Sequence, residues 1–456
     1  MVDPIAVASI VLAVGGFGAY FADRARSLRR HRAAWQDAIR ACRLRKVRSS
    51  GWIGFASTAR SDSFAIRVQS VGRPSGVVLE VRVHDLTDRI ALLMPEIVQA
   101  NRPVTSNEDV VVGEPRLDDR MILSGEPLVV RAMLDGETRD LLLALVLGTT
   151  DPSRPAPPVR ALHLSDGTLS IDAESSELPN TLRTLLRLAE RLAEVPPVEE
   201  AVAAVAVDDC LPSVRIECLR ALVEERPRHP ATRSALRTAL SDPDARVRLV
   251  AALTLRTEGR EVLLAIARDP DSADDLASRA IPALAAHLPA DDAERTLEQA
   301  VRARRYETAA ACLDSLAARG AAGLPPIRRV LEGPSDTCAA LAAQALGISG
   351  TAEAEPLLAR ALDHESAELR TAAARSLGRV GTAAAVPALR ALAEGGDAAL
   401  QRIVRESVAS IQSRLSGAGQ GQLALAAEGG GVSLSDGSAG RLGLTNAGTK
   451  PSSASG

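Results

Sequence analysis

The five cysteines and six histidines are the side chains of this 456-residue sequence with the widest chemical repertoire. The cysteines form no CxxC pair, and their odd number argues against a framework of disulfides. The histidines are scattered, without an HExxH motif or another spacing typical of a metal site. We therefore expect reduced cysteines packed within helices, histidines on the surface or in loops, and neither a metal nor a cofactor.

Two further segments carry groups that could form a site. Asp118, Asp119 and Arg120 could make a polar cluster, but a turn with solvated charges is the simpler interpretation. Gly417 to Gly421 is glycine-rich, yet it lies in a tail with no strand or helix to turn it into a phosphate-binding loop. The sequence has no nucleophile elbow either. It thus predicts no catalytic residue, no small-molecule substrate and no enzymatic activity.

The composition favours a helical protein with unevenly distributed charge. Only eight residues are aromatic, and seven of them lie at or before Phe64, so Ala, Leu and Val must build most of the core, as in close-packed helices. Of the 54 basic residues 52 are arginines, which we attribute first to the codon usage of a GC-rich genome. Residues 1–50 carry ten basic and three acidic side chains, or +7; because the total is −3, the other 406 residues carry −10. This length is typical of two or three domains.

A run of 17 uncharged residues, from Ile5 to Phe21, predicts an N-terminal membrane anchor. As a helix it would be about 26 Å long, near the lower limit for crossing a bilayer. Tyr20 and Phe21 end the run, where aromatic residues favour the membrane interface. A cleaved signal peptide fits less well, because only Met, Val, Asp3 and Pro4 precede the run, without a positive charge. A buried helix of a soluble protein is the other alternative.

The segment after this anchor (residues 1–22) is strongly basic and is predicted to be a helix over residues 23–50. By the positive-inside rule it stays in the cytoplasm. The expected location is therefore the bacterial inner membrane, as a single-pass protein with its N-terminus outside and its body in the cytoplasm. The arginines nearest the run are the candidates for contact with the membrane surface: Arg24, Arg26, Arg29, Arg30 and Arg32. A solvated amphipathic helix is the alternative interpretation of the same residues.

Residues 51–197 predict a small α+β domain. Alternating apolar residues indicate strands at residues 64–69, 77–83 and 108–112. An Asp-Gly pair between alternating apolar residues indicates a hairpin at residues 162–171. Helical periodicity is found over residues 127–134, 137–147 and 180–194. The stretch from Gly113 to Pro127, with Glu137–Leu142 and the hairpin, resembles an uncharacterised bacterial domain often found behind a membrane helix. That resemblance implies no chemistry.

Residues 198–415 repeat with a period of about 31 residues. An apolar anchor recurs in steps of 33, 29, 32, 30, 31 and 31 residues, at Leu222, Leu255, Leu284, Leu316, Leu346, Leu377 and Val408. In the clearest copy a short helix over 356–362 is followed by capping oxygens at 363–366, a longer helix over 367–380 and a stop at Gly381. No unit of this size can bury its own apolar face, so neighbouring units must stack. The pattern predicts an α-solenoid of about seven helical hairpins in a mostly α protein.

The repeat resembles HEAT repeats, specifically the short variety of phycobilisome-lyase-type arrays. The resemblance rests on an Asp…Val-Arg…Ala-Ala…Leu…Gly pattern around Arg248 and Arg370 and on an earlier copy around Arg215. It implies that these arginines first of all tie adjacent repeats together, and that they are secondarily candidate contacts on the concave face. One kind of HEAT-like enzyme holds two irons with His-Glu pairs on several repeats. Because this sequence has a single such pair, His364–Glu365, the resemblance transfers no catalytic residue.

The last segment, residues 416–456, is rich in Gly, Ser and Ala and is predicted to be a disordered tail. Its three loosely repeated phrases, each with two leucines separated by one residue, could instead add strands to the edge of a partner's sheet.

Taken together, these features predict a membrane-tethered scaffold or adaptor that binds a protein partner through its solenoid on the cytoplasmic face. The acidic body weakly favours a basic partner. A nucleic-acid-binding HEAT-like protein is the first alternative and a lyase-type HEAT-like enzyme the second. Nucleic-acid binding would need a basic face studded with aromatic residues, whereas the acidic body offers one aromatic side chain after Phe64, Tyr306, beside a few arginines. We therefore expect no nucleic acid.

Overall fold

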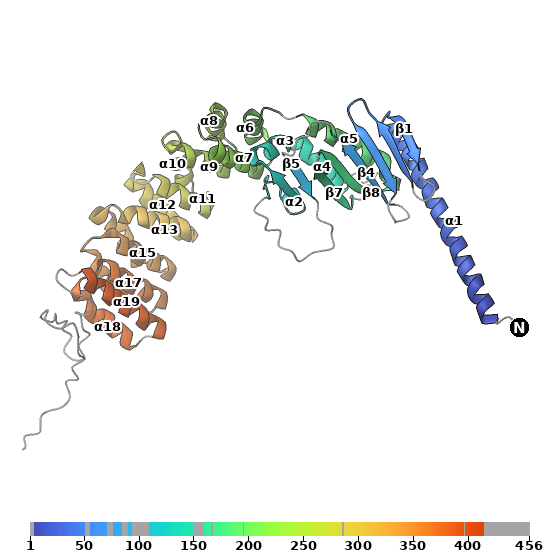
Figure 1. Ribbon diagram of the computed structural model, residues 1–456. Helices are drawn as coiled ribbons and strands as arrows, with labels where there is room; N and C mark the ends of the chain where they lie inside the picture. Colours follow the sequence, from blue (N-terminus) through green and yellow to red (C-terminus); the bar gives the residue numbers. More distant parts are fainter. Residues whose placement is uncertain are drawn as a thin grey trace, which may run out of the picture. The chain divides into compact units, whose positions relative to one another are not determined.

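The protein is described by a computed structural model that covers residues 4–50, 55–70, 76–83, 90–93, 109–148, 159–165, 167–194, 196–284, 287–395 and 397–414 (Figure 1). The chain divides into two compact units, Met1–Thr254 and Leu255–Gly456, which we call the sheet unit and the repeat unit. The predicted boundary between the α+β domain and the repeats was at residue 198. That boundary stays a prediction. The first two helical hairpins lie in the sheet unit, and the first of them packs on the α+β part.

The sheet unit contains an eight-stranded sheet in which every pair is antiparallel. Its order is β1-β2-β3-β4-β8-β7-β5-β6. The strands are β1 (Arg45–Ser50), β2 (Ala56–Arg60), β3 (Ala65–Ser70), β4 (Gly76–Arg82), β5 (Ile90–Leu93), β6 (Ile122–Gly125), β7 (Ala161–Ser165) and β8 (Thr168–Glu174). The predicted hairpin over residues 162–171 is the β7–β8 pair, with Gly167 in the turn at a φ of +67°.

The register of the central strands places alternate apolar residues opposite one another on one face. Leu79 of β4 pairs with Ile171 of β8, and Val81 pairs with Leu169. All four side chains are buried, as the period of two along a strand requires for a sheet with one covered face. The buried face therefore provides the core of this unit.

Helices cover that face of the sheet (Figure 1). Helix α5 (Leu178–Ala193) buries a leucine stripe and packs on β4 and β8, on α1 (Pro4–Ala41) and on α4 (Gly136–Leu147). The remaining elements of this part are α2 (Pro115–Asp118), α3 (Pro127–Met133) and the short η1 (Ser175–Glu177). Helical periodicity thus located α3, α4 and α5 correctly within two residues at each end.

Two predicted elements of this unit are wrong. Residues 109–112 do not form a strand. They are held beside β6 by two hydrogen bonds, from Val110 N to Leu123 O and from Leu123 N to the carboxylate of Asp109. The predicted helix over 23–50 ends at Ala41, and Arg43, at a φ of +52°, turns the chain into β1.

The structure also corrects the predicted location in the membrane. Among the residues that the structure describes, no helix combines the length and the apolar character needed to cross a bilayer, so the prediction of a single-pass inner-membrane protein is wrong. The described side chains of α1 begin at Asp23, and most of them are charged or polar. A narrow apolar stripe of this helix, with Trp35 and Ala38 at 1% and 0% exposure, packs into the core of the sheet unit.

The helical hairpins follow one another in sequence. The sheet unit holds α6 (Val198–Asp208), α7 (Pro212–Glu225), α8 (Pro230–Ala239) and most of α9 (Ala245–Leu255). The repeat unit holds α10 (Arg260–Arg268), α11 (Asp274–Leu284), α12 (Ala290–Ala303), α13 (Tyr306–Ala317), η3 (Gly320–Gly323), α14 (Leu324–Leu331), α15 (Asp336–Ser349), α16 (Ala354–Ala361), α17 (Ala367–Val380), η4 (Ala383–Ala385), α18 (Val386–Glu394) and α19 (Ala398–Arg414). We call the odd-numbered helices α11 to α19 the second helices, because each closes a hairpin and packs on the next one.

Small residues bring the second helices close together. A Cβ atom added to Gly347 of α15 would lie 2.6 Å from Ser376 Oγ and 2.9 Å from Ser376 Cα. One hairpin later, a Cβ atom added to Gly378 of α17 would lie 2.9 Å from the Cα of Ser407. Glycine at this position, repeated after 31 residues, therefore lets α15, α17 and α19 approach one another more closely than any other residue would allow.

The predicted disordered tail, residues 416–456, and its leucine phrases lie outside the described residues.

Candidate functional site

The first hairpin is fixed to the α+β part of the sheet unit by buried contacts. Arg139 Nη2 of α4 lies 2.5 Å from Asp209 Oδ2, and each side chain is only 3% exposed. Ser213 Oγ, at the start of α7, donates to the carbonyl of Gly113 at 2.5 Å. Gly113 has a φ of +89°, and a Cβ atom there would lie 2.7 Å from the backbone of Ser213. This close approach holds residues 109–113 against α7.

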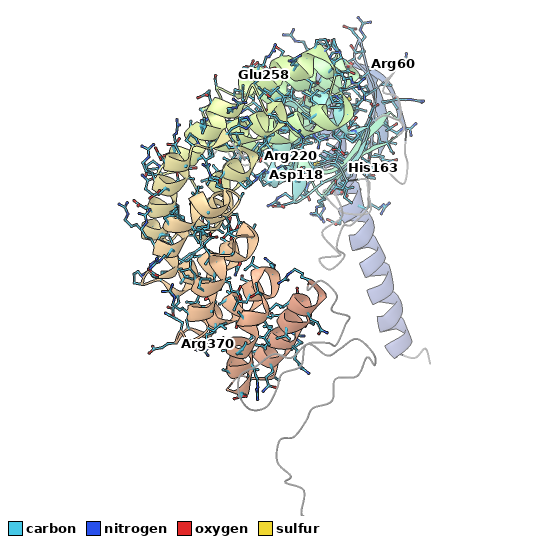
Figure 2. The ribbon with its side chains drawn as sticks, turned by 90° about the vertical axis from the view of Figure 1, so that its left-hand side faces the viewer. Arg60, Asp118, His163, Arg220, Glu258 and Arg370 are labelled. Atoms are coloured by element: carbon cyan, nitrogen blue, oxygen red, sulfur yellow. The ribbon has the colours of Figure 1, made fainter. Side chains whose placement is uncertain are left out.

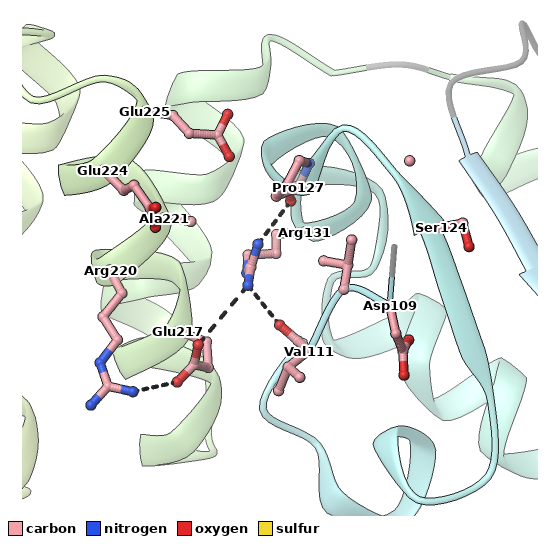
Figure 3. Close-up of a pocket in the computed structure, with 12 residues that line it drawn as sticks. Asp109, Val111, Ser124, Pro127, Arg131, Glu217, Arg220, Ala221, Glu224 and Glu225 are labelled. Carbon is pink, nitrogen blue, oxygen red and sulfur yellow. Dashed lines mark hydrogen bonds and ion pairs between the residues drawn. The ribbon is translucent and has the colours of Figure 1, made fainter. Parts of the chain in front are cut away.

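The same arrangement leaves a cavity of about 780 Å³ between α7 and the segment that runs from residue 109 to residue 131 (Figure 3). We call it the α7 pocket. Its lining consists of Asp109, Val110, Val111, Ser124, Gly125, Pro127, Arg131, Glu217, Arg220, Ala221, Glu224 and Glu225. Four of these residues are acidic and two are basic, so the pocket is negative overall.

Arg131 is the buried cation of the pocket, at 9% exposure. Its guanidinium donates to the carbonyl oxygens of Val111 at 2.7 Å and Pro127 at 3.2 Å, and it lies 4.0 Å from Glu217 Oε2 (Figure 3). Glu217 also accepts from Arg220 at 2.8 Å. Arg131 Nε has no hydrogen-bond partner among the residues that the structure describes. The carboxylate of Glu217 is therefore shared between two arginines, while one donor of Arg131 is unused.

Glu224 and Glu225 present the unpaired carboxylates of the pocket. Neither makes a hydrogen bond or an ion pair through its side chain within the described part of the chain. Burial raises the pKa of Glu225; Arg226 and Arg131 oppose this rise, and the charges of Glu126 and Glu224 add to it. A half-buried carboxylate beside like charges is unfavourable when ionised, and a cation nearby would relieve that cost.

Replacement of Glu225 by Gln should stabilise the protein slightly at neutral pH. The pKa of this carboxyl is higher in the folded state than in the unfolded state. Folding therefore takes up a proton at a pH between these two pKa values, and at a pH above both the ionised carboxylate destabilises the folded state. We expect Glu225→Gln to raise the free energy of unfolding by up to about 0.5 kcal/mol at pH 7. The gain should shrink as the pH falls through the raised pKa, where Glu225 becomes protonated. Thermal melts of both proteins at pH 7 and pH 4 test this, and an unchanged gain at pH 4 would contradict it.

Comparison with known proteins identifies the repeat. Residues 324–409, from α14 into α19, match the family described as HEAT repeats. This segment of the repeat unit is therefore similar to HEAT repeats. No curated protein matches the sequence. Human deoxyhypusine hydroxylase, solved in complex with glycerol, is a structural match with 17% sequence identity and a TM-score of 0.22, covering 47% of this chain and 96% of that one. Such a low TM-score supports no inference about activity.

The arginines predicted from the HEAT pattern lie at equivalent places. Arg215 donates to both carboxylate oxygens of Asp242 at 2.8 Å and to the carbonyl of Asp209 at 2.6 Å. Arg248 donates to the carbonyl six residues earlier, Asp242 O, at 2.7 Å. Arg370, at the start of α17 (Figure 2), donates to His364 O at 2.9 Å. Each guanidinium thus satisfies carbonyl groups of the turn that precedes its helix.

Only the first of these three arginines also joins two repeats through an acidic partner, because Asp242 lies 27 residues beyond Arg215. Elsewhere Arg268 and Asp292, at 2.6 Å, make a comparable bridge. Contact of Arg215, Arg248 or Arg370 with a partner stays a prediction. Arg215 is buried, so it offers such a partner little surface.

Three second helices of the repeat unit carry exposed residues at equivalent positions. Asp314, Gln344 and Arg375 recur at intervals of 30 and 31 residues on α13, α15 and α17, and Ile348 and Arg379 recur one turn further along α15 and α17. We call these five residues the second-helix surface. All five are exposed, and Ile348 has 51% of its surface open to solvent.

The charges of the second-helix surface are not neutralised locally. Arg375 makes no hydrogen bond or ion pair with any residue that the structure describes. Although Asp314 is exposed, partial desolvation of its carboxyl raises its pKa, and the positive charge of Arg379, two repeats away, opposes that rise. The surface therefore offers an exposed apolar side chain between an acidic end and a basic end.

The other predicted site residues lie away from the α7 pocket or stay untested. Asp118 accepts from the backbone N–H groups of Val112 at 3.0 Å and Gly113 at 2.9 Å, so its carboxylate organises a turn. Burial raises the pKa of this half-buried carboxyl, so its charge is not fully solvated, whereas the simpler interpretation of this segment predicts solvated charges. The described residues bring together no group of three or more His, Cys, Asp or Glu side chains that could hold a metal, and His364 accepts from Ser366 N in a capping turn.

The five basic residues predicted at the membrane surface lie on α1. Arg26, Arg29, Arg30 and Arg32 are exposed and Arg24 is half-buried. Nothing in the structure tests whether these five arginines bind lipid, so this stays a prediction. Sequence reasoning missed Glu224 and Glu225, for which the only signal was the negative charge of the chain after residue 50.

Proposed function

We propose that the chain is a scaffold or adaptor that binds a protein partner through its HEAT repeats and catalyses no reaction. HEAT repeats are typical of protein-interaction solenoids, and this coarser function follows from the family match. The second-helix surface is the observation that supports the finer proposal. It extends over α13, α15 and α17, which at about 9–10 Å per helix is about 20 Å, a span suited to another protein.

The second-helix surface has the composition of a protein-binding site. Ile348 supplies an exposed apolar centre, and Asp314 and Arg375 supply charges of opposite sign on either side. Such a mixed surface favours a folded protein or peptide of matching charge over a nucleic acid, which would need basic residues along the whole groove. An enzyme would need convergent reactive groups, and the surface supplies none among these five residues.

Rigid spacing of the repeats suits a scaffold. Arg305 donates to Ser272 O at 2.9 Å and Arg414 to Gly381 O at 2.7 Å, so side chains of one repeat bind the turn of the preceding repeat. With the close approach of the second helices, these bonds hold the exposed residues in a fixed register.

Reversal of two charges on α17 should abolish partner capture. We expect full-length protein with Arg375→Glu and Arg379→Glu to retain at least about tenfold less of its specific partner in a quantitative pull-down. The matched control carries Arg328→Glu and Arg360→Glu, which are exposed on the first helices α14 and α16. Equal capture by both variants would contradict the proposed surface. Capture of nucleic acid in place of protein, removed by nuclease, would favour the alternative function.

A further inference from the structure

The α7 pocket combines features that no contact within the described chain explains. Glu224 and Glu225 face the cavity with unpaired carboxylates, and Glu225 is half-buried. Leaving a partly desolvated carboxylate without a partner is unfavourable, and two adjacent carboxylates add repulsion to that cost. Arg220 of α7 is already bound to Glu217 at 2.8 Å. Arg226, whose charge lowers the pKa of Glu225, is itself bound to Glu199 at 3.0 Å and to Glu126 at 3.5 Å.

On the opposite wall of the pocket, the Nε donor of Arg131 lacks an acceptor. Arg131, nine-tenths buried, uses its two terminal nitrogens on the carbonyls of Val111 and Pro127, and its Nε has no partner among the described residues. Val111 is itself 50% exposed at the rim, an unusual exposure for an apolar side chain. The Nε atom is enclosed, with less than 1 Å² of accessible surface, so a ligand does not reach it. A ligand that suits the pocket therefore brings a cation for the glutamates and some apolar surface.

We infer that the α7 pocket binds an arginine or lysine side chain from a segment of a partner protein. A cavity of about 780 Å³ is large enough for such a side chain with its neighbouring backbone. A basic side chain brings a cation to the glutamates and an aliphatic stem to the exposed Val111, whereas an anionic ligand would face four carboxylates. This inference rests on the proposed function in that it assumes a protein partner, but it concerns a different surface.

A labelled arginine peptide tests the pocket directly. The probe is a fluorescent nonapeptide in which glycine and arginine alternate, and its twin with glutamate in place of arginine is the negative probe. Fluorescence anisotropy at 50 mM salt should show binding of the arginine probe to the full-length protein and no binding of the glutamate probe. The E224Q/E225Q variant should bind the arginine probe at least about tenfold more weakly.

The control variant removes the same charge elsewhere in the sheet unit. Glu190 and Glu194 are exposed at the end of α5 and make no ion pair within the described part of the chain. The E190Q/E194Q variant should therefore bind the arginine probe less than about twofold more weakly than the unaltered protein. Equal weakening by both variants, or none by E224Q/E225Q, would overturn the inference. If spermine competed for the same site more tightly than the peptide, a small polycation and not a protein segment would be the ligand.

The proposals for the α7 pocket and for the second-helix surface can be tested independently. The R375E/R379E variant should bind the arginine probe as the unaltered protein does, while it loses partner capture. Loss of probe binding in R375E/R379E would overturn the assignment to the α7 pocket and leave the proposed scaffold function standing.

Discussion

Replacement of Asp242 by Asn is expected to lower the free energy of unfolding by about 3–5 kcal/mol. Arg215 Nε and Nη2 each donate to one carboxylate oxygen of Asp242 at 2.8 Å, and the two side chains are 7% and 5% exposed. A neutral amide at position 242 would leave the buried guanidinium without its counter-charge. Urea unfolding followed by circular dichroism measures the loss.

Two further variants separate the buried ion pair from a general effect of substitution. Asp244 lies in the same turn but pairs with Arg246, whose side chain is 56% exposed, so Asp244→Asn should cost less than about 1 kcal/mol. The double variant Arg215→Met with Asp242→Leu removes both charges and should be much closer to the unaltered protein. A loss from Asp242→Asn no larger than that from Asp244→Asn would contradict this account of the bridge.

Replacement of both Gly347 and Gly378 by Ala should destabilise the repeat unit by about 3 kcal/mol. Each new methyl group would lie 2.9 Å or less from atoms of a serine on the next helix, so α15, α17 and α19 would have to move apart. The gain of about 1 kcal/mol that alanine normally brings in a helix reduces this cost but does not cancel it. The midpoint of urea unfolding gives the measurement.

Gly395 provides the matched control for the glycine variant. A Cβ atom there would meet nothing within 4 Å, and the residue has ordinary right-handed dihedral angles. Gly395→Ala should therefore be neutral or stabilise the protein by up to about 1 kcal/mol. If the Gly347/Gly378 double variant were as stable as Gly395→Ala, close packing of the second helices would not matter for the array.

The repeats could be predicted because their signals are local. The predicted helix over 367–380 is α17, and Ser366 caps it by accepting from Leu369 N as its position before the helix suggested. Leu346 and Leu377, two of the apolar anchors, are fully buried. Caps, helical periodicity and a fixed repeat length all lie within about 31 residues of sequence.

Most of the missed strands could not be recognised from their own residues. β1 is Arg45–Ser50, with no alternation of apolar side chains, and β5 and β6 have only four residues each. Such segments become strands because of the neighbours they pair with, and β6 pairs with β5 across more than 25 residues of sequence. Of the predicted strand at 108–112, the described residues 109–112 lie next to β6 but form no regular ladder of hydrogen bonds with it.

The α7 pocket depends on an approach between residues 100 positions apart. Gly113 and Ser213 meet through one hydrogen bond, and this contact helps the buried Arg139–Asp209 pair to hold α7 beside the segment that carries Arg131. The arginine excess also proved partly structural. Arg215, Arg305 and Arg414 each bind backbone carbonyls, for which a guanidinium offers several donors in a fixed geometry.

Hydrogen–deuterium exchange of the full-length protein, with and without its captured partner, tests the central claim most directly. The scaffold account predicts that partner binding slows exchange in α13, α15 and α17, the helices of the second-helix surface, and that R375E/R379E loses this protection. Protection confined to other parts of the chain, or unchanged by R375E/R379E, would contradict the claim that the repeat unit binds the partner through this surface.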